Sequence, residues 1–464
     1  MKLIYNVNDK PKFGQLIVFA IQQLLAIMAA TLVVPVITGH GMSPAAALFG
    51  AGAGTLVYVM FTQKKSPVFL GSSFAFLGSM AAAFAGGVTV SLGYLGLILG
   101  AIFAGLVYVV IAIAVKFAGV EWLNKLMPTV VIGPTVSIIG LSLAGNAVSD
   151  LKTGGFKMTR IIDGVETQVS AANPLLCVLI GLITLFVTML CSTYGKKMAR
   201  LIPFILGILA GYATALVLTV IGNSADIPAL QIIDLSNFTA LAADGVSIKT
   251  FLQLPDFTFL TALGGFSELN GAYVGTIAVA YVPVAFVVFA EHVADHKNIS
   301  SIIEKDLLEE PGLSRTLLGD GVGSMVGAIF GGCPNTTYGE SIGCVAITRN
   351  ASVYTIITAA VGAMIIAFLS PFVAFVNSIP SCVMGGVCMA LYGFIAVSGL
   401  KMVQEVDLNK NRNLFVVSAI LIAGIGGLTL NFGKVTITSI AAALIIGIIA
   451  NQMLSKEKDE AGAE

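Results

Sequence analysis

Two long stretches without charged residues constrain this chain more than any other feature. Residues 13–63 and 66–115 contain no Asp, Glu, Lys or Arg. Because a helix needs about 20 residues to cross roughly 30 Å of hydrocarbon, each stretch has room for two membrane-spanning segments. Only 10% of the 464 residues are charged and the mean hydropathy is +0.97, whereas about 25% of the residues in a soluble domain are charged. The sequence therefore predicts an all-α polytopic membrane protein.

The same reasoning along the whole chain predicts fourteen transmembrane segments. Four lie in the two uncharged stretches, with turns near 39–44 and 86–93. The other ten are expected at 125–146, 174–192, 200–222, 272–294, 314–331, 334–349, 351–369, 371–398, 413–430 and 434–453. Segments 66–84 and 334–349 would be poor continuous helices, because glycine, proline and threonine disfavour helix. The polar stretches 147–173 and 223–271 are expected on the surface.

The positions of the basic residues predict the orientation. If the N-terminus is cytoplasmic and the segments alternate, 19 of the 24 Lys and Arg residues fall on the cytoplasmic side. The five on the outer side are Lys152, Lys157, Arg160, Lys249 and Lys434. This distribution agrees with the positive-inside rule, so both termini are expected in the cytoplasm. No cleavage site follows the first apolar run, and we expect no signal peptide.

Several functional classes find no support in the sequence. The net charge of zero provides no basic footprint for nucleic acid. Three histidines and six scattered cysteines show neither metal-ligand nor disulfide spacing, and we find no phosphate loop or nucleophile elbow. We therefore expect no cofactor, no metal site and no enzymatic activity.

Polar and glycine-rich positions recur between the two halves at offsets close to 270 residues. The pairs are Gln22–Gln23 with Glu291–His292, AGAGT (51–55) with GVGSM (321–325), and GSSFAF (71–76) with TTYGES (336–341). Two halves of seven segments face opposite ways, which predicts inverted repeats. Broken segments at equivalent positions of the two halves indicate a binding site. The alternative is a glycine-rich kink that serves helix packing.

Acidic residues within the predicted segments point to the same region. A charge at mid-membrane costs roughly 2.5–3.5 kcal/mol on insertion scales, so such residues are functional or neutralised. Glu291 follows an apolar run and is expected to bind substrate and exchange a proton, unless it is a buried acid satisfied by His292 or a backbone amide. Asp295 lies one helical turn further on the same face. It either shares that proton or lies at the wet cytoplasmic end.

Glu340 lies among helix-breaking residues in NTTYGESIG. If a helix resumes after it, free backbone N–H groups and the positive end of the helix dipole lie close to this carboxylate. An ion pair with Arg349 is the alternative. Asp320 is expected near water at the start of a helix, and His296 at the membrane interface.

Two carboxylates flanked by free backbone donors favour one class of ligand. They suit a neutral, planar solute that offers N–H groups to the carboxylates and carbonyl groups to the amides. A nucleobase has this pattern, whereas two acids would repel sulfate or bicarbonate. Phe74 or Tyr338 would add an aromatic face for stacking.

Several of these segments resemble a known family. GESIGCVAITR (339–349) is similar to the signature of the nucleobase–ascorbate transporter family, in which Glu340, Gly343, Thr348 and Arg349 match and Ser341 replaces the usual Asn. The segments LGSSFAF (70–76), AEHV (290–293), KDLLEEPGL (305–313) and PNTTYGE (334–340) resemble its bacterial uracil permease branch. The resemblance extends from about Gln15 to Met453.

The resemblance implies two inverted seven-span repeats, with short antiparallel strands in spans 3 and 10. It implies a core domain at 13–115 and 272–369 and a gate domain at 125–222 and 371–453, with homodimerisation through the gate domain. Carried over residue by residue, Glu291 and Glu340 bind the base, and backbone groups at Phe74 and Gly339 contact it. Glu291 is implied as the proton-linked acid.

Besides Ser341, two positions depart from the family pattern. Gln22–Gln23 stands where many members have Gln-His. Asp295 stands where some uracil transporters have a histidine that bonds the acid, and His296 is shifted by one residue. The proton relay is therefore expected to differ, with two carboxylates that titrate as a pair.

Together these features predict a proton-coupled symporter that imports uracil across the cytoplasmic (inner) membrane by alternating access. A xanthine or other purine permease of the same family is the nearest alternative. An anion exchanger on the same fold is another. Whether sodium rather than the proton is the coupling ion stays open, because carboxylates bind either ion.

Overall fold

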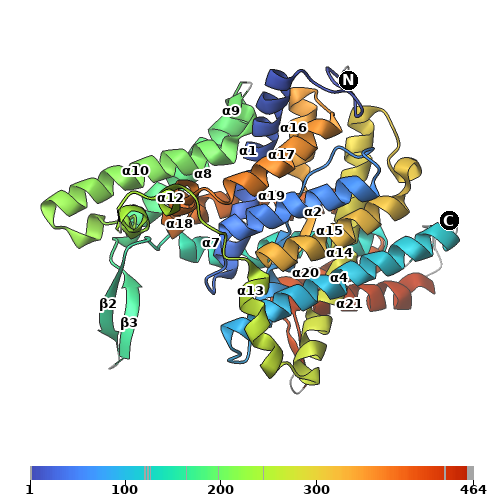
Figure 1. Cartoon of the computed structure of the whole chain (residues 1–464). Helices are drawn as coiled ribbons and strands as arrows, with labels where there is room; N and C mark the ends of the chain where they lie inside the picture. Colours follow the sequence, from blue (N-terminus) through green and yellow to red (C-terminus); the bar gives the residue numbers. More distant parts are fainter. Residues whose placement is uncertain are drawn as a thin grey trace.

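Helices form most of the molecule (Figure 1). The structure is a computed structural model that describes residues 3–456 except 120–121, 123–124, 126, 163–164, 197, 244 and 433–434. Lys434, one of the basic residues expected on the outer side, thus lies outside the described residues.

The first group of helices comes from two distant parts of the chain. Its members are α1 (Phe13–Thr38), α2 (Pro44–Phe61), α3 (Leu77–Ala83), α4 (Val90–Ala118), α14 (Gly271–Ile303), α15 (Leu313–Gly331), α16 (Gly339–Thr348) and α17 (Val353–Ile366). Helix α15 packs against α2 and α4, α14 packs against α4, and α17 packs against α1 and α2. The first quarter of the chain is thus interleaved with the third.

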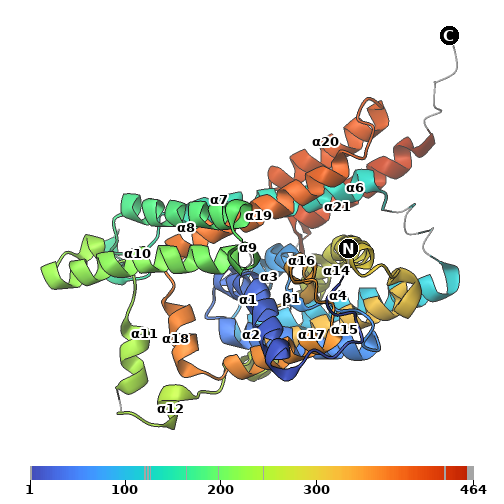
Figure 2. The same cartoon turned by 90° about the horizontal axis from the view of Figure 1, so that it is seen from above.

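The second group lies beside the first. Its members are α6 (Thr129–Ser142), α7 (Ala144–Asp150), α8 (Pro174–Tyr194), α9 (Met198–Leu201), α10 (Pro203–Ala225), α18 (Ser370–Ser378), α19 (Ser381–Val403), α20 (Asn411–Ile425) and α21 (Ser439–Met453). Helix α19 packs on α6 and α8, and α6 also contacts α20 and α21. Figure 2 shows α6, α19, α20 and α21 together on one side of α4, α14 and α15.

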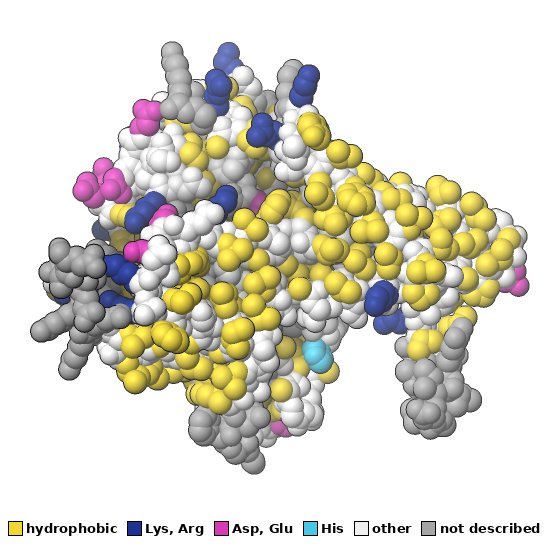
Figure 3. Space-filling view, turned by 180° about the vertical axis from the view of Figure 1, so that it is seen from behind, with side chains coloured by type: hydrophobic (Ala, Val, Ile, Leu, Met, Phe, Trp, Pro, Cys, Tyr) yellow, Lys and Arg dark blue, Asp and Glu magenta, His cyan; other side chains and the backbone are white. Residues whose placement is uncertain are grey.

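The apolar helices agree with a membrane protein, although the number of spans stays a prediction. Eight described helical stretches are long and apolar enough to cross a membrane: α1, α2, α4, α6 with α7, α8, α10, α14 and α19. Four further apolar helices are shorter: Phe74–Ala83, α17, α20 and α21. Apolar side chains cover the middle of the face in Figure 3, and Lys and Arg gather mainly towards its edges.

The long polar stretches form surface structure, as expected. Strands β2 (Lys157–Ile162) and β3 (Val165–Ser170) pair as an antiparallel hairpin that projects from the body (Figure 1). Short helices follow α10: η2 (Pro228–Leu230), α11 (Ser236–Thr239), η3 (Ala240–Ala242), α12 (Ile248–Phe251), α13 (Thr258–Ala262) and η4 (Leu263–Glu268). A second hairpin joins β5 (Leu430–Phe432) to β6 (Val435–Ile437) between α20 and α21.

Both segments that the sequence marks as poor helices are broken. Residues 66–84 contain β1 (Leu70–Ser72), the 3-10 turn η1 (Phe74–Phe76) and α3, whereas residues 334–349 contain β4 (Asn335–Thr337) and α16. The strands pair antiparallel, with Gly71 opposite Thr336. The short antiparallel strands implied by the family resemblance are therefore confirmed.

The predicted segment 371–398 is divided in the structure. The stretch 371–398 is not one helix, because α18 ends at Ser378 and α19 begins at Ser381. Pro380 lies between them in an extended conformation at the N-cap of α19. Proline has no backbone N–H and favours a helix start, which explains the division.

Glycine allows α2 and α15 to cross with their backbones in contact. A Cβ atom added to Gly50 would collide with the carbonyl of Gly327, and one added to Gly54 would collide with the carbonyl of Gly323. Small residues permit this close approach between helices in lipid. The glycine-rich stretches 51–55 and 321–325, paired above by their offset, thus lie on helices that pack against each other.

Candidate functional site

A cavity of about 400 Å³ lies between the two groups of helices. Every residue that the sequence analysis assigned to a site lines it: Phe74, Glu291, Asp295, Tyr338, Gly339 and Glu340. Helices α6, α10 and α19 form the opposite wall with largely apolar side chains, among them Val136, Ile139, Phe204, Leu391, Phe394 and Ile395. The broken segments of the two halves therefore meet at one cavity.

Two helix starts face this cavity. Strand β4 ends at Thr337, Tyr338 is extended, and α16 begins at Gly339 with Glu340 in its first turn. On the other broken segment, η1 begins at Phe74, directly after β1 and Ser73. The first N–H groups of a helix have no partner within the helix. The condition that a helix resumes after Glu340 is therefore met, since α16 continues to Thr348.

Three carboxyl groups line the cavity. The Glu291 side chain is exposed to it, although it lies deep in the molecule, and Asp295 and Glu340 are half-buried. Thr337 donates a hydrogen bond of 2.7 Å to Oδ2 of Asp295. None of the described residues that line the cavity is a lysine or arginine.

Glu340 and Arg349 lie at opposite ends of α16, where Arg349 is the C-cap residue. In the described part of the chain no ion pair joins them. The alternative in which Arg349 neutralises Glu340 is therefore wrong.

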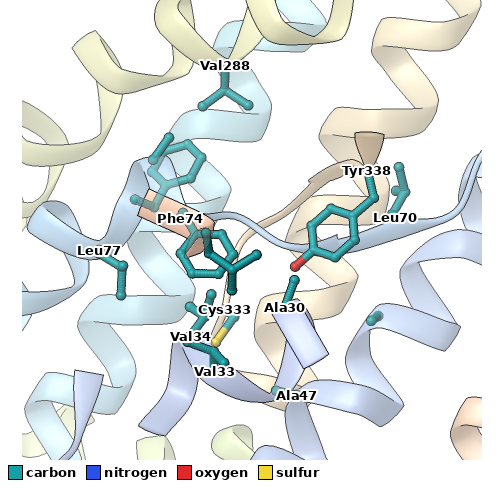
Figure 4. Packing of buried hydrophobic residues seen from close by; sticks show 14 of the residues in the cluster. Ala30, Val33, Val34, Ala47, Leu70, Phe74, Leu77, Val288, Cys333 and Tyr338 are labelled. Carbon is teal, nitrogen blue, oxygen red and sulfur yellow. The ribbon is translucent and has the colours of Figure 1, made fainter. Parts of the chain in front are cut away.

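The two candidate aromatic residues differ in their freedom to stack. The ring of Tyr338 packs over Gly71, and its hydroxyl donates a 2.6 Å hydrogen bond to the carbonyl of Ser72. Phe74 contacts Tyr392 edge to face at a centroid distance of 6.1 Å. Figure 4 shows Phe74 and Tyr338 in the packed cluster around Cys333. A hydrogen bond thus fixes the ring of Tyr338, whereas the ring of Phe74 is held by packing alone.

Asp320 is fully buried, which corrects the expectation that it lies near water. Its Oδ2 lies 2.7 Å from Nδ1 of His292, and Nε2 of His292 lies 3.0 Å from the Thr316 hydroxyl. Both ring nitrogens of His292 are therefore engaged on α15. The alternative that His292 serves as the partner of Glu291 is wrong, because the two side chains leave α14 in different directions.

His296 is also fully buried, so the expectation of an interfacial position is wrong. Its Nε2 lies 2.7 Å from the Tyr58 hydroxyl, and its ring stacks on His292 at a centroid distance of 4.0 Å. The reason is that α14 continues to Ile303, well beyond the predicted end at 294. His296 consequently lies within the helix, on the side that faces α2.

Gln23 in span 1 and Ser341 in the signature, which both depart from the family pattern, are in contact. The side-chain amide of Gln23 donates a hydrogen bond to the hydroxyl of Ser341, which also accepts one of 3.0 Å from the backbone N–H of Phe69. Ser341 thus connects α1, the start of β1 and α16. The third departure, Asp295, lies on the cavity wall and binds Thr337.

Sequence reasoning missed two parts of the site. Thr337 lies within a quoted motif, but nothing in the sequence distinguishes it from Thr336. Phe204 and Phe394 lie in apolar spans, where an aromatic residue that faces a cavity has the same sequence pattern as one that faces lipid.

A second cavity, of about 950 Å³, adjoins the first and shares Ala290, Ala294 and Met402 with it. Its lining includes the charged residues Lys116, Lys297, Glu309 and Glu405. Charged side chains mark the wet end of a path through an apolar molecule. The two cavities thus adjoin on the side where α4 and α19 end.

Broken segments that meet at a cavity between two helical units are typical of secondary transporters. A model described as the permease family matches residues 14–432. The uracil permease of Bacillus caldolyticus is 38% identical over 456 residues, which are 98% of this chain and 95% of the relative. The uracil permease of Bacillus subtilis (strain 168) is 35% identical and covers 99% and 97% of the two chains. The chain therefore belongs to the nucleobase–ascorbate transporter family of permeases.

Solved structures share the fold at low sequence identity. The transmembrane domain of a cyanobacterium bicarbonate transporter, BicA, has a TM-score of 0.59 and 13% identity, over 96% of this chain and all of that one. The murine Slc26a9 anion transporter in the inward-facing state has a TM-score of 0.61 and 11% identity, over 97% and 69% of the two chains. The fold thus resembles that of these transporters.

Proposed function

We propose that this protein imports uracil together with a proton by alternating access. The observation that carries the proposal is that Glu291 on α14 and Glu340 at the start of α16 line the same cavity. We take uracil as the substrate because the relatives are named uracil permeases. The cavity volume of about 400 Å³ lies within the range of roughly 300–1,000 Å³ that small-molecule sites occupy.

The chemistry of the lining suits a pyrimidine ring. Carboxylates of Glu291 and Glu340 accept hydrogen bonds from the ring N–H groups. Backbone N–H groups at Gly339 and Phe74 donate to the ring carbonyls, since helix starts leave such donors free. Phe74 covers one face of the ring.

Proton coupling follows from the charge of the cavity. Ionising Glu291, Asp295 and Glu340 together would place like charges in one apolar space, where their repulsion is poorly screened. A shared proton relieves this repulsion and lets the loaded carrier move without an uncompensated charge. Glu291 is the proton-linked acid in this scheme, and Asp295, held by Thr337, is its partner.

Alternating access requires the two helix groups to move against each other. In our proposal the core domain, 13–115 and 272–369, carries the substrate past a gate domain, 125–222 and 371–453. Two copies associate through the gate domain in the cytoplasmic membrane, with both termini in the cytoplasm. No chemical conversion of the substrate takes place.

An anion exchanger is the second candidate, because the solved structures of similar fold include a bicarbonate and an anion transporter. Three carboxyl groups and the lack of Lys or Arg among the described lining residues make the cavity repulsive to anions. The geometry therefore favours a neutral substrate.

Counterflow of radiolabelled uracil in proteoliposomes, with an imposed pH gradient and without sodium, tests the proposal. We expect exchange of uracil, accumulation driven by the gradient, and recovery of unchanged uracil. Exchange that requires sodium would overturn proton coupling. Exchange of xanthine or of sulfate in place of uracil would overturn the assignment of uracil as the substrate.

A further inference from the structure

The cavity wall opposite the carboxyl groups contains an aromatic pair. Phe204 on α10 and Phe394 on α19 meet edge to face, with ring centroids 6.0 Å apart and an interplanar angle of 75°. Phe204 is buried at 8% exposure, whereas Phe394 is 58% exposed. Phe204 therefore supports a ring whose other side faces open space.

The same two rings line another cavity. It has a volume of about 560 Å³ and lies between α8, α10 and α19, where Leu185, Thr188 and Met189 also line it. Phe204, Phe394 and Ser398 are common to this space and to the acidic cavity. The aromatic pair thus forms a partition between two voids.

Other apolar residues of this wall do not border both spaces. Val136, Leu391 and Ile395 line the acidic cavity, but the lining of the neighbouring void does not include them. Truncating one of them would enlarge the acidic cavity locally. Truncating Phe394 would instead join two volumes of about 400 and 560 Å³.

The polar half of the site does not distinguish a pyrimidine from a purine of similar chemistry. The six-membered ring of xanthine carries the same alternation of N–H and carbonyl groups as uracil, so Glu291, Glu340 and the backbone donors would bind either one. Discrimination by ring size must then come from the apolar wall.

We propose that the Phe204–Phe394 pair bounds the acidic cavity on the side where the second ring of a bicyclic base would lie, and so determines its selectivity for a monocyclic pyrimidine. The inference rests on the proposed function and adds two specificity residues to it. In this proposal the base binds with its ring C–H edge towards α10 and α19, so that a second ring fused at that edge would meet Phe394.

The test measures uptake of labelled uracil and of labelled xanthine in proteoliposomes, each with the other base as unlabelled competitor. The wild-type protein is expected to transport uracil and to reject xanthine. In Phe394→Ala we expect xanthine to compete about tenfold or more better than in the wild type, and labelled xanthine to be transported. Phe204→Ala is expected to shift selectivity in the same direction, because Phe394 loses its support.

Two control variants distinguish a specific effect of the aromatic pair from an unspecific effect of any truncated side chain. Ile395→Ala enlarges the acidic cavity by a smaller volume and does not reach the neighbouring cavity, so xanthine competition should increase much less than in Phe394→Ala. Phe415→Ala changes an exposed ring on α20, outside both cavities, and should leave uptake unchanged. If Phe394→Ala does not fold, as judged by size-exclusion chromatography, Phe394→Leu provides the same comparison with a smaller opening.

Uracil uptake by Phe394→Ala or Phe394→Leu with undiminished rejection of xanthine would overturn the inference while leaving the proposed function intact. Equal gains in xanthine competition for Ile395→Ala and Phe394→Ala would also overturn it. A wild-type protein that transports no uracil would instead overturn the proposed function.

Discussion

The hydroxyl of Thr337 donates a hydrogen bond of 2.7 Å to the carboxylate of Asp295 and so joins the end of β4 to α14. Thr337 itself is fully buried and pairs with Leu70 across the ladder. One bond therefore connects the two broken segments to the helix that carries Glu291. Asp295 thus lies, half-buried, on the wall of the acidic cavity.

Replacing Thr337 by valine keeps the shape of the side chain and removes this bond. A hydrogen bond to a charged group contributes about 1.5–3 kcal/mol, and about 1.4 kcal/mol corresponds to a factor of ten. We expect Thr337→Val to lower the initial rate of uracil uptake about tenfold or more, and Thr337→Ser to retain most of it. Equal uptake rates for the valine variant and the wild type would show that uptake does not depend on the hydrogen bond from Thr337 to Asp295.

Glu291→Gln keeps the size and much of the hydrogen bonding of the side chain but cannot take up or release a proton. We expect this variant to bind uracil and exchange it in counterflow, while accumulation driven by a pH gradient is lost. Glu268→Gln is the matched control, because Glu268 is exposed and bonds Thr89 away from the cavity. Gradient-driven accumulation at the wild-type level in Glu291→Gln would refute the proton-linked role.

The buried pair of His292 and Asp320 is expected to matter for stability. Removing one partner of a buried pair typically costs about 3–5 kcal/mol, because the other polar group is left unpaired. We expect Asp320→Ala to lower the thermal unfolding temperature in detergent markedly and Asp320→Asn to lower it less. Glu310→Ala, which breaks an exposed ion pair with Lys65, should have a small effect. Similar unfolding temperatures for Asp320→Ala and Glu310→Ala would contradict this account.

Two glycine substitutions are expected to differ in their effect on stability, because only one of them lies at the contact between α2 and α15. In Gly54→Ala the new methyl group would collide with the carbonyl of Gly323, so the helices must separate and stability should fall. In Gly362→Ala on α17 the nearest atom would be a Leu24 methyl carbon at 3.8 Å, an ordinary contact. We expect this second variant to be as stable as the wild type, since alanine favours helix. Thermal unfolding of the two purified variants compares them directly.

The ion pair at the end of α2 predicts a dependence of stability on pH. Lys65 donates a 2.7 Å hydrogen bond to Glu310 and, by this bond and its charge, holds the pKa of the Glu310 carboxyl below its ordinary value of 4.5. A lowered pKa in the folded state stabilises the protein above the ordinary value, and this stabilisation is lost as the pH falls through the lowered one. Near neutral pH, the Lys65→Gln variant should therefore unfold at a slightly lower temperature than the wild type. The difference should vanish well below pH 4.5, and a difference that persists there would exclude this origin.

The sequence alone predicted the broken segments and the acids of the cavity. Glycine and threonine in 66–84 and 334–349 disfavour helix wherever these segments lie, and a carboxyl within an apolar run is costly in any arrangement. Glu291, Asp295 and Glu340 could therefore be selected before any contact was known. The family resemblance then supplied the strands β1 and β4, which local patterns do not reveal because each has only three residues.

The partners of the buried polar residues were decided by the tertiary structure. Whether His292 meets Glu291 or Asp320 depends on how α14 and α15 are rotated and how closely glycines let them approach. Likewise, Phe204 and Phe394 come from distant helices, and only their packing places both rings between the same two cavities. A sequence determines what each residue tolerates around it, whereas the choice among tolerated neighbours is made by the packing of elements far apart in the chain.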